Sequence, residues 1–166
     1  TLSGGNLTGF SLSFPGCALR AASRFVTGIT LNDVVVTNCT AGQVAIYSWT
    51  PLVMNQCSIH DNASGGVGLS TDPNVNGSSK LTTITNTTIA RNDGIAISSI
   101  RSVSGKQHSF NLTNVTLSDN DQTLAGVSTV GAITTTANAV LKNVTIANDH
   151  GRGISALYDF YGTPTV

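Results

Sequence analysis

Residues 110–120 read Phe-Asn-Leu-Thr-Asn-Val-Thr-Leu-Ser-Asp-Asn, and versions of this stretch recur along the chain. Each version contains a tetrapeptide that ends in an apolar residue: residues 33–36, 56–59, 86–89, 114–117 and 143–146, with a fainter one at 9–12. Their last residues lie 23 to 30 positions apart. A recurrence of this length is typical of a solenoid, in which each repeat packs only against its neighbours.

The repeats share columns of like residues. An apolar residue stands two positions before each tetrapeptide, and a mostly polar residue stands three positions after it. The apolar column is Leu7, Leu31, Met54, Ile84, Leu112 and Leu141, and the polar column is Cys39, Asn62, Asn92, Asn120 and Asp149. Within the tetrapeptide the apolar residues alternate with polar ones, as in a strand with one buried face. We expect Asn62, Asn92, Asn120 and Asp149 to form an interior ladder, because stacked Asn side chains can satisfy one another in a buried turn.

A second apolar stretch follows each polar column residue, so each repeat should contribute strands to more than one sheet. The repeats differ in length mainly through insertions at 70–80, 98–109 and 121–130. These insertions should follow the second strand and project from one side of the molecule. Repeat proteins often use such loops for contact with partners, although solvated connectors are the simpler interpretation.

The pattern predicts an all-β chain folded as a right-handed parallel β-helix, a solenoid of about six coils, with residues 1–166 in one domain. The main alternative is a β-sandwich of many short strands, which would not require one shared residue pattern. Residues 1–5 are too short and Gly-rich to cap the first coil, whereas residues 157–166, with Tyr158, Phe160 and Tyr161, could fold over the C-terminal end, and the chain has no initiator Met. We therefore expect the chain to belong to a larger protein or assembly in which another domain or copy covers at least the first coil.

Composition excludes several functional classes. Charged residues make up 10% of the chain, and eight basic residues balance eight acidic ones, which argues against a nucleic-acid partner. No apolar run is long enough for a membrane helix, so we expect no membrane insertion by this segment.

Residues 110–120 and 140–149 resemble the repeats of right-handed parallel β-helix proteins. These include polymorphic outer-membrane-protein-like passengers, pectate-lyase-like proteins and similar algal or bacterial surface proteins. The resemblance covers about residues 5–156. It implies a fold but no single function, since such folds include adhesins, structural proteins, lyases and hydrolases.

Sequons and cysteines predict a secreted or cell-surface glycoprotein. We expect glycosylation at seven sequons, foremost at Asn76 in a Gly/Ser-rich loop, and also at Asn6, Asn38, Asn86, Asn111, Asn114 and Asn143. The sequon at Asn62 belongs to the interior ladder and should stay unmodified. Cys17 and Cys39 occupy nearly the same corner of successive coils and should form a disulfide, whereas Cys57 should be buried and reduced.

Two fragments are similar to parts of polygalacturonase-like hydrolases. Residues 92–97 resemble the segment around their paired catalytic aspartates, but this chain has Asp93 followed by Gly94, where acid–base chemistry needs a second carboxylate. Residues 149–155 resemble their Gly-His-Gly segment, with Asp149 in place of the first glycine and Arg152 inserted. Because of these departures we expect no catalytic residue. We also expect no cofactor and no metal, since the histidines fall at unrelated positions and no Cys-x-x-Cys pair exists for zinc.

The favoured function is therefore a structural or adhesive module, a rigid rod that displays loops and glycans and takes part in a surface assembly or filament. The alternative is a β-helix that binds or cleaves carbohydrate on its loop face. A set of carboxylates converging in a groove would favour that alternative.

Overall fold

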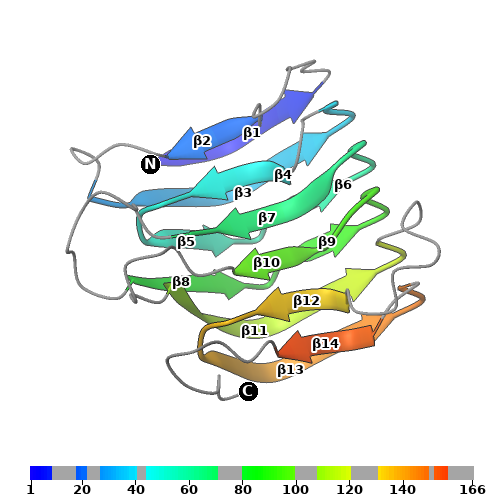
Figure 1. The fold of residues 1–166 in the computed structure, drawn as a ribbon. Helices are drawn as coiled ribbons and strands as arrows, with labels where there is room; N and C mark the ends of the chain where they lie inside the picture. Colours follow the sequence, from blue (N-terminus) through cyan, green and yellow to red (C-terminus); the bar gives the residue numbers. More distant parts are fainter. Residues whose placement is uncertain are drawn as a thin grey trace.

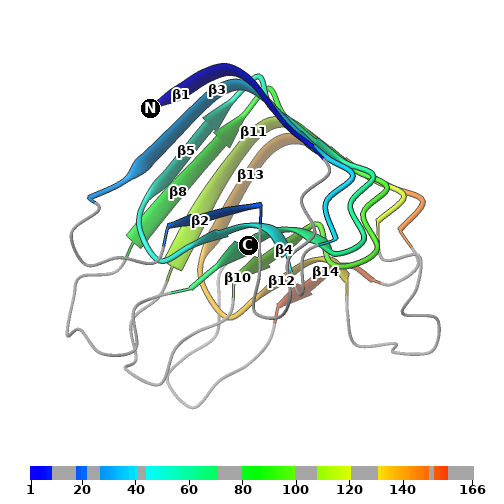
Figure 2. The ribbon, with the colours of Figure 1, turned by 90° about the horizontal axis from the view of Figure 1, so that it is seen from above.

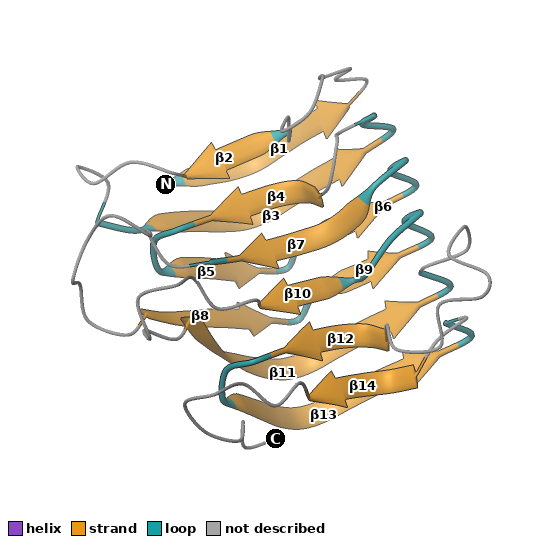
Figure 3. Ribbon diagram, in the orientation of Figure 1, coloured by secondary structure: helices purple, strands orange, loops and turns teal. Residues whose placement is uncertain are grey.

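The computed structural model describes residues 1–8, 18–21, 27–40, 44–70, 80–99, 108–120, 131–149 and 152–156. This part of the chain is all-β, with fourteen strands and no helix (Figure 3). All of the strand pairs are parallel, and they form two sheets (Figure 1). No helix in the described ranges could cross a lipid bilayer.

The first sheet holds eight strands. They are β1 (Leu2–Thr8), β3 (Ile29–Thr37), β5 (Leu52–Asn55), β6 (Ser58–His60), β8 (Lys80–Thr85), β9 (Thr88–Ala90), β11 (His108–Ser118) and β13 (Ala139–Ala147). The short strands β5 and β6 both pair with β3, and β8 and β9 both pair with β11. Each short pair therefore corresponds to one long strand of a neighbouring repeat.

The second sheet has the order β14-β12-β10-β7-β4-β2. Its strands are β2 (Leu19–Ala21), β4 (Val44–Ser48), β7 (Gly65–Leu69), β10 (Ile97–Ser99), β12 (Gly131–Thr135) and β14 (Arg152–Ala156). The chain alternates between the two sheets, and each strand pairs with its counterpart from an adjoining repeat (Figures 1 and 2). Parallel pairing follows from this alternation, because every strand is reached by a crossover rather than by a hairpin.

The strand register confirms the two main apolar columns. The first runs from Leu31 through Met54, Ile84 and Leu112 to Leu141, and the second from Val36 through Ile59, Ile89 and Leu117 to Ile146. Both columns lie in the first sheet. The β-sandwich alternative, in which such sets would be scattered over two facing sheets, is therefore wrong for these strands.

The predicted alignment of the first repeat is wrong by five residues. Leu7 was expected beside Leu31, but β1 pairs Leu2 with Leu31 and Leu7 with Val36. Gly4 takes the position that Asp33 occupies in the next repeat, with φ of 59° against 53°. The tetrapeptide of the first repeat is therefore residues 4–7 rather than 9–12, and its glycines left too little side-chain pattern to reveal it.

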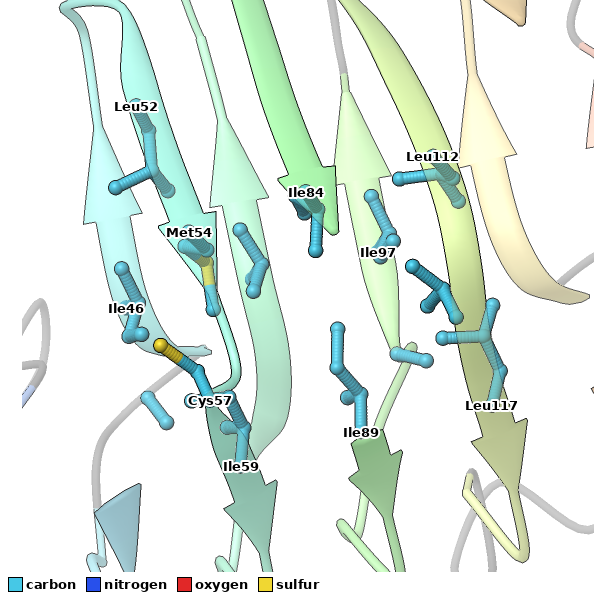
Figure 4. Packing of buried hydrophobic residues seen from close by; sticks show 14 of the residues in the cluster. Ile46, Leu52, Met54, Cys57, Ile59, Ile84, Ile89, Ile97, Leu112 and Leu117 are labelled. Atoms are coloured by element: carbon cyan, nitrogen blue, oxygen red, sulfur yellow. The ribbon is translucent and has the colours of Figure 1, made fainter. Parts of the chain in front are cut away.

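Apolar side chains of both sheets meet in one core (Figure 4). Met54, Ile84 and Leu112 of the first sheet are fully buried, as are Ile46 and Ile97 of the second. Complete burial of such a side chain contributes about 1.5–3 kcal/mol to folding. Leu141 and Ile146 of the last described repeat are only partly buried and pack at the edge of this cluster.

One expectation about the insertions also needs correction. The segments 71–79 and 100–107 follow strands of the second sheet, β7 and β10, as expected. The segment 121–130 instead connects β11 of the first sheet to β12 of the second, so it precedes the second-sheet strand of its repeat. The three insertions therefore do not share one connection, and these segments lie outside the described residues.

Candidate functional site: the polar columns of the repeats

Two residues in each repeat have left-handed backbone conformation, five positions apart. The first set is Asp33, Gln56, Asn86, Asn114 and Asn143, and the second is Asn38, Asp61, Arg91, Asp119 and Asn148, with φ between 49° and 58° throughout. Asn and Asp tolerate this conformation better than most residues, which explains why they dominate both sets. Figure 2 shows that the ribbons of β11 and β13 bend along their length, and each of these strands contains one residue of the first set. Each residue of the second set directly follows the last residue of a strand of the first sheet.

Asn62, Asn92 and Asn120 are buried and lie in one hydrogen-bonded column. Asn62 Nδ2 donates to Asn92 Oδ1 over 2.8 Å, and Asn92 Nδ2 donates to Asn120 Oδ1 over 2.9 Å. The backbone N–H of Asn120 donates to Asp149 Oδ1 over 2.7 Å. The structure thus brings all four residues of the expected interior ladder together.

Backbone groups complete this interior ladder. The amide nitrogen of each Asn also donates to the carbonyl of the last but one residue of a strand in the preceding repeat, at Val36, Ile59 and Ile89. The amide oxygen of Asn62 accepts from the backbone N–H of Cys39 over 3.0 Å. Each buried side-chain amide therefore both donates and accepts, which removes most of the cost of burying it.

A second Asn column lies on the surface. Asn86 Nδ2 donates to Asn55 Oδ1, Asn114 Nδ2 to Asn86 Oδ1, and Asn143 Nδ2 to Asn114 Oδ1, over 3.0, 3.0 and 2.8 Å. We call these four residues the exposed ladder. Its donors point toward the preceding repeat, whereas the side-chain donors of the interior ladder point along the column toward the following repeat. The sequence showed the recurring Asn as sequons that the repeat geometry alone could also explain, but one Asn per repeat does not reveal a bond between side chains.

One charged cluster stands on the second left-handed column. Arg91 makes two hydrogen bonds to Asp61, from Nε and Nη2, over 2.7 and 2.8 Å, and His60 Nδ1 lies 2.6 Å from Asp61 Oδ2. The Arg91 bond and the His60 bond hold the pKa of the Asp61 carboxyl at about 2. Because this cluster is exposed, it contributes little to stability.

His108 is a buried polar residue that nothing in the sequence pattern singled out. Its Nδ1 lies 2.8 Å from the carbonyl of Ser70, so Nδ1 carries the proton, and Nε2 accepts from the Thr82 hydroxyl over 2.8 Å. Ser99 Oγ donates to the His108 carbonyl over 2.6 Å. His108 therefore joins three segments, the end of β7, strand β8 and strand β10. Burial lowers its pKa below the usual value.

The cysteines occupy different columns. Cys57 is a free, buried thiol whose Sγ donates to the carbonyls of Leu31 and Asn55, and burial raises its pKa. Cys39 is buried at the start of the interior ladder. Cys17 lies outside the described residues, so the Cys17–Cys39 disulfide stays a prediction.

The sequons fall into distinct environments. Asn62 is buried in the interior ladder, Asn86, Asn114 and Asn143 belong to the exposed ladder, Asn38 is exposed at a left-handed turn, and Asn111 is half-buried on β11. Asn76 lies outside the described residues, and only the backbone of Asn6, in β1, is described.

In the first fragment similar to hydrolases, Gly94 has a role in packing. A Cβ at Gly94 would lie 2.8 Å from the backbone nitrogen of Gly65, so this position needs glycine for close approach of two segments. The residue that replaces the second carboxylate is thus required by the backbone. Asp93 is exposed beside it. Of the second fragment, His150 and Gly151 lie outside the described residues.

A small aromatic cluster lies on the second sheet near its β2 edge. The Tyr47 and Trp49 rings meet edge to face, with centroids 6.3 Å apart, and Trp49 Nε1 donates to the Tyr47 hydroxyl over 2.7 Å. The Arg20 guanidinium lies about 6 Å from both ring centroids. A Cβ at Gly68, the residue that pairs with Tyr47, would be 3.1 Å from the Tyr47 ring. The glycine therefore lets this ring lie over the neighbouring strand.

Groups of three or more potential metal ligands do not occur among the described residues. No protein-family model, curated protein or solved structure matches the chain.

Proposed function

We propose that the chain is a right-handed parallel β-helix of about six coils that serves as a structural or adhesive module of a secreted or cell-surface glycoprotein. The in-register pairing of successive repeats supports the β-helix. The right-handed sense is supported by the strong preference for right-handed crossovers between parallel strands of one sheet. The proposal extends the resemblance to β-helical surface proteins to this chain.

The observation that carries the functional proposal is the pair of ladders, the interior one and the exposed one. Each joins successive repeats with bonds of 2.8 to 3.0 Å between side chains, in addition to the strand pairing. Such cross-links between neighbours resist bending and local opening along the stack. Stiffness along one axis is a property that a rod holding loops away from a surface requires.

Two of the described acidic residues, Asp61 and Asp149, support a structural role better than a catalytic one. Asp61 is held by Arg91, and Asp149 accepts from the interior ladder. Catalytic carboxylates need to converge on a substrate with separated pKa values. These two residues have structural partners instead.

The proposed β-helical stack can be tested by deletion of one repeat. Deletion of residues 90–117 joins Ile89 to Ser118, which follows the equivalent Leu117, so the register of every column is kept. We expect a folded protein whose longest dimension in small-angle scattering is shorter by about 4.8 Å, one strand spacing. Deletion of residues 90–110, which breaks the register, is the matched control and should unfold the chain. Equal tolerance of both deletions would contradict the β-helix.

The functional role needs a separate measurement. The whole chain should release no new reducing ends or unsaturated products from polyuronates or neutral polysaccharides. Turnover that disappears in Asp93→Asn or Asp61→Asn would favour the enzymatic alternative. Beads coated with the chain should adhere to cells or extracellular matrix, or associate with one another, whereas beads coated with the register-breaking deletion should not.

Carbohydrate binding is a second candidate function, favoured by the aromatic cluster at Arg20, Tyr47 and Trp49. Half-exposed aromatic rings beside a cation can contact both the apolar face of a sugar and an acidic substituent. Trp49 is the only tryptophan of the chain, so its fluorescence reports on this cluster alone. Saturable quenching by an oligosaccharide, lost in Tyr47→Ala but kept in Val53→Ala on the other sheet, would support binding. Unchanged fluorescence across neutral, uronate and sulfated oligosaccharides would reject it.

A further inference from the structure

The exposed ladder uses the same nitrogen atoms that N-glycosylation would modify. Asn86, Asn114 and Asn143 are sequon residues, and the Nδ2 of each donates to the Asn of the preceding repeat over 3.0, 3.0 and 2.8 Å. An N-linked sugar replaces one of the two hydrogens on Nδ2. The ladder bond already uses one of these two hydrogens, so a sugar could occupy only the one remaining direction around the planar amide.

Space along the stack adds a second restriction. Asn86, Asn114 and Asn143 belong to adjacent repeats, because β11 pairs with both β9 and β13. Neighbouring strands are about 4.8 Å apart. A sugar ring with its hydroxyls is wider than this spacing, so glycans on adjacent ladder positions would overlap.

Two other sequons have the opposite geometry. Asn38 is exposed on the second left-handed column, and within the described residues its side chain makes no hydrogen bond. Asn111 points outward from the middle of β11, between Thr83 and Val140 of the adjoining strands, and its amide is likewise unbonded in the described part. Both side-chain amides can carry a substituent without loss of a ladder bond.

We propose that the sequons of the described part divide into two classes: Asn38 and Asn111 carry N-linked glycans in the folded protein, whereas Asn62, Asn86, Asn114 and Asn143 stay unmodified because their amides build the ladders. Modification precedes folding in the secretory pathway. A sugar on Asn62 would replace a bonded hydrogen, and a sugar on an exposed-ladder Asn would have to fit between adjacent repeats, so a chain modified at either place is retained. This inference rests on the proposal of a secreted glycoprotein. It follows that the Asn residues of the repeat sequons serve mainly to join the repeats in the folded chain.

The test is site-resolved glycan mapping of the whole chain, secreted from a eukaryotic cell line behind a leader peptide. Enzymatic release of glycans in ¹⁸O-water converts each occupied Asn to labelled Asp. We expect label at Asn38 and Asn111 in the secreted protein, and none at Asn62, Asn86, Asn114 or Asn143. Label at a ladder position in the secreted, folded protein would overturn the inference, as would the absence of label at Asn38.

Variants of single sequons test the same assignment by the total glycan mass, which does not depend on how efficiently each peptide is detected. Asn38→Gln should lose the mass of one glycan, and Thr40→Ala, which destroys the same sequon while keeping Asn38, should lose the same mass. Asn114→Gln should leave the glycan mass unchanged. The repeat-deletion and adhesion experiments test the proposed function without any glycan, so failure of the partition and failure of that function can be distinguished.

Discussion

At the scale of single residues, Asn92 stabilises the fold through several buried hydrogen bonds. It donates to Ile59 O and Asn120 Oδ1 and accepts from both nitrogens of Asn62. Asn92→Ala leaves several of these buried groups without partners, each at a cost of about 1–3 kcal/mol. We expect a loss of about 3 kcal/mol or more in unfolding free energy, measured by urea titration.

Asn55→Ala is the control for this prediction. Asn55 begins the exposed ladder, is half-exposed and lacks the left-handed backbone of its ladder neighbours. Water can replace the bonds that its side chain accepts, so the cost should stay near or below about 1 kcal/mol. Equal losses in the two variants would show that burial of the interior ladder is not what stabilises it.

His108 predicts a pH dependence of stability with a definite sign. Burial lowers its pKa below 6.5 in the folded state, an effect that nearby Lys80 adds to and the bond to Ser70 O opposes. Between the folded and unfolded pKa values the unfolded chain binds more protons, so stability falls as the pH drops through this window. The slope approaches about 1.4 kcal/mol per pH unit inside it.

The measurement is the unfolding free energy from pH 7.5 down to 4.5. His108→Gln keeps a donor and an acceptor but removes the titration, so its stability should vary less over this range. His60→Gln, in the exposed charged cluster, should retain the decline. A decline that survives in His108→Gln would assign the effect to another group.

At the scale of structural elements, the close approach of residues 64–65 and 94 limits the side chains that can stand there. A Cβ at Gly94 would lie 2.8 Å from Gly65 N and 3.1 Å from Gly65 Cα, and these backbone atoms cannot move independently of β7. Gly94→Ala should therefore destabilise the chain by about 1–3 kcal/mol.

Gly153→Ala provides the comparison, since its Cβ would meet only Ile146 Cγ2 at an ordinary 3.8 Å. Its melting temperature should stay close to that of the parent chain. A melting temperature of Gly94→Ala that also stays unchanged would mean that the two segments can separate without cost.

The sequence predicted the elements best where side chains repeat. Leu31, Met54 and Ile84 revealed their own register because a buried column admits only apolar residues. The first repeat was misplaced because Gly4 supplies backbone conformation rather than a side chain. The bonds of the exposed ladder and of His108 also escaped prediction. They depend on side-chain direction and on which segments meet, and neither follows from spacing.

At the scale of the whole molecule, each sheet has two outer strands. Among the described strands these are β1 and β13 in the first sheet, and β2 and β14 in the second. Outer parallel strands with unpaired backbone groups favour the addition of another strand. We expect the 166-residue chain to associate in a concentration-dependent way, measured by sedimentation velocity.

A charge at one outer strand should weaken this association. Thr145 on β13 and Thr88 on β9 lie in one exposed column, through their common neighbour Thr116. Thr145→Lys should shift the chain toward monomer, because strand addition would bring like charges of two copies close together, whereas Thr88→Lys on an inner strand should not. A parent chain that stays monomeric at high concentration would contradict end-to-end association.

The opposite directions of the two Asn ladders have an electrostatic consequence. Each side-chain amide is a dipole, and a single stack of amides all pointing one way would build an axial field with each added repeat, as the peptide units of an α-helix do. Here the bonds between interior side chains run toward the following repeat and those between exposed side chains toward the preceding one, while each interior amide also donates to a backbone carbonyl of the preceding repeat. The two sets of bonds between side chains therefore run in opposite directions, so added repeats do not align all of these amides into one common dipole.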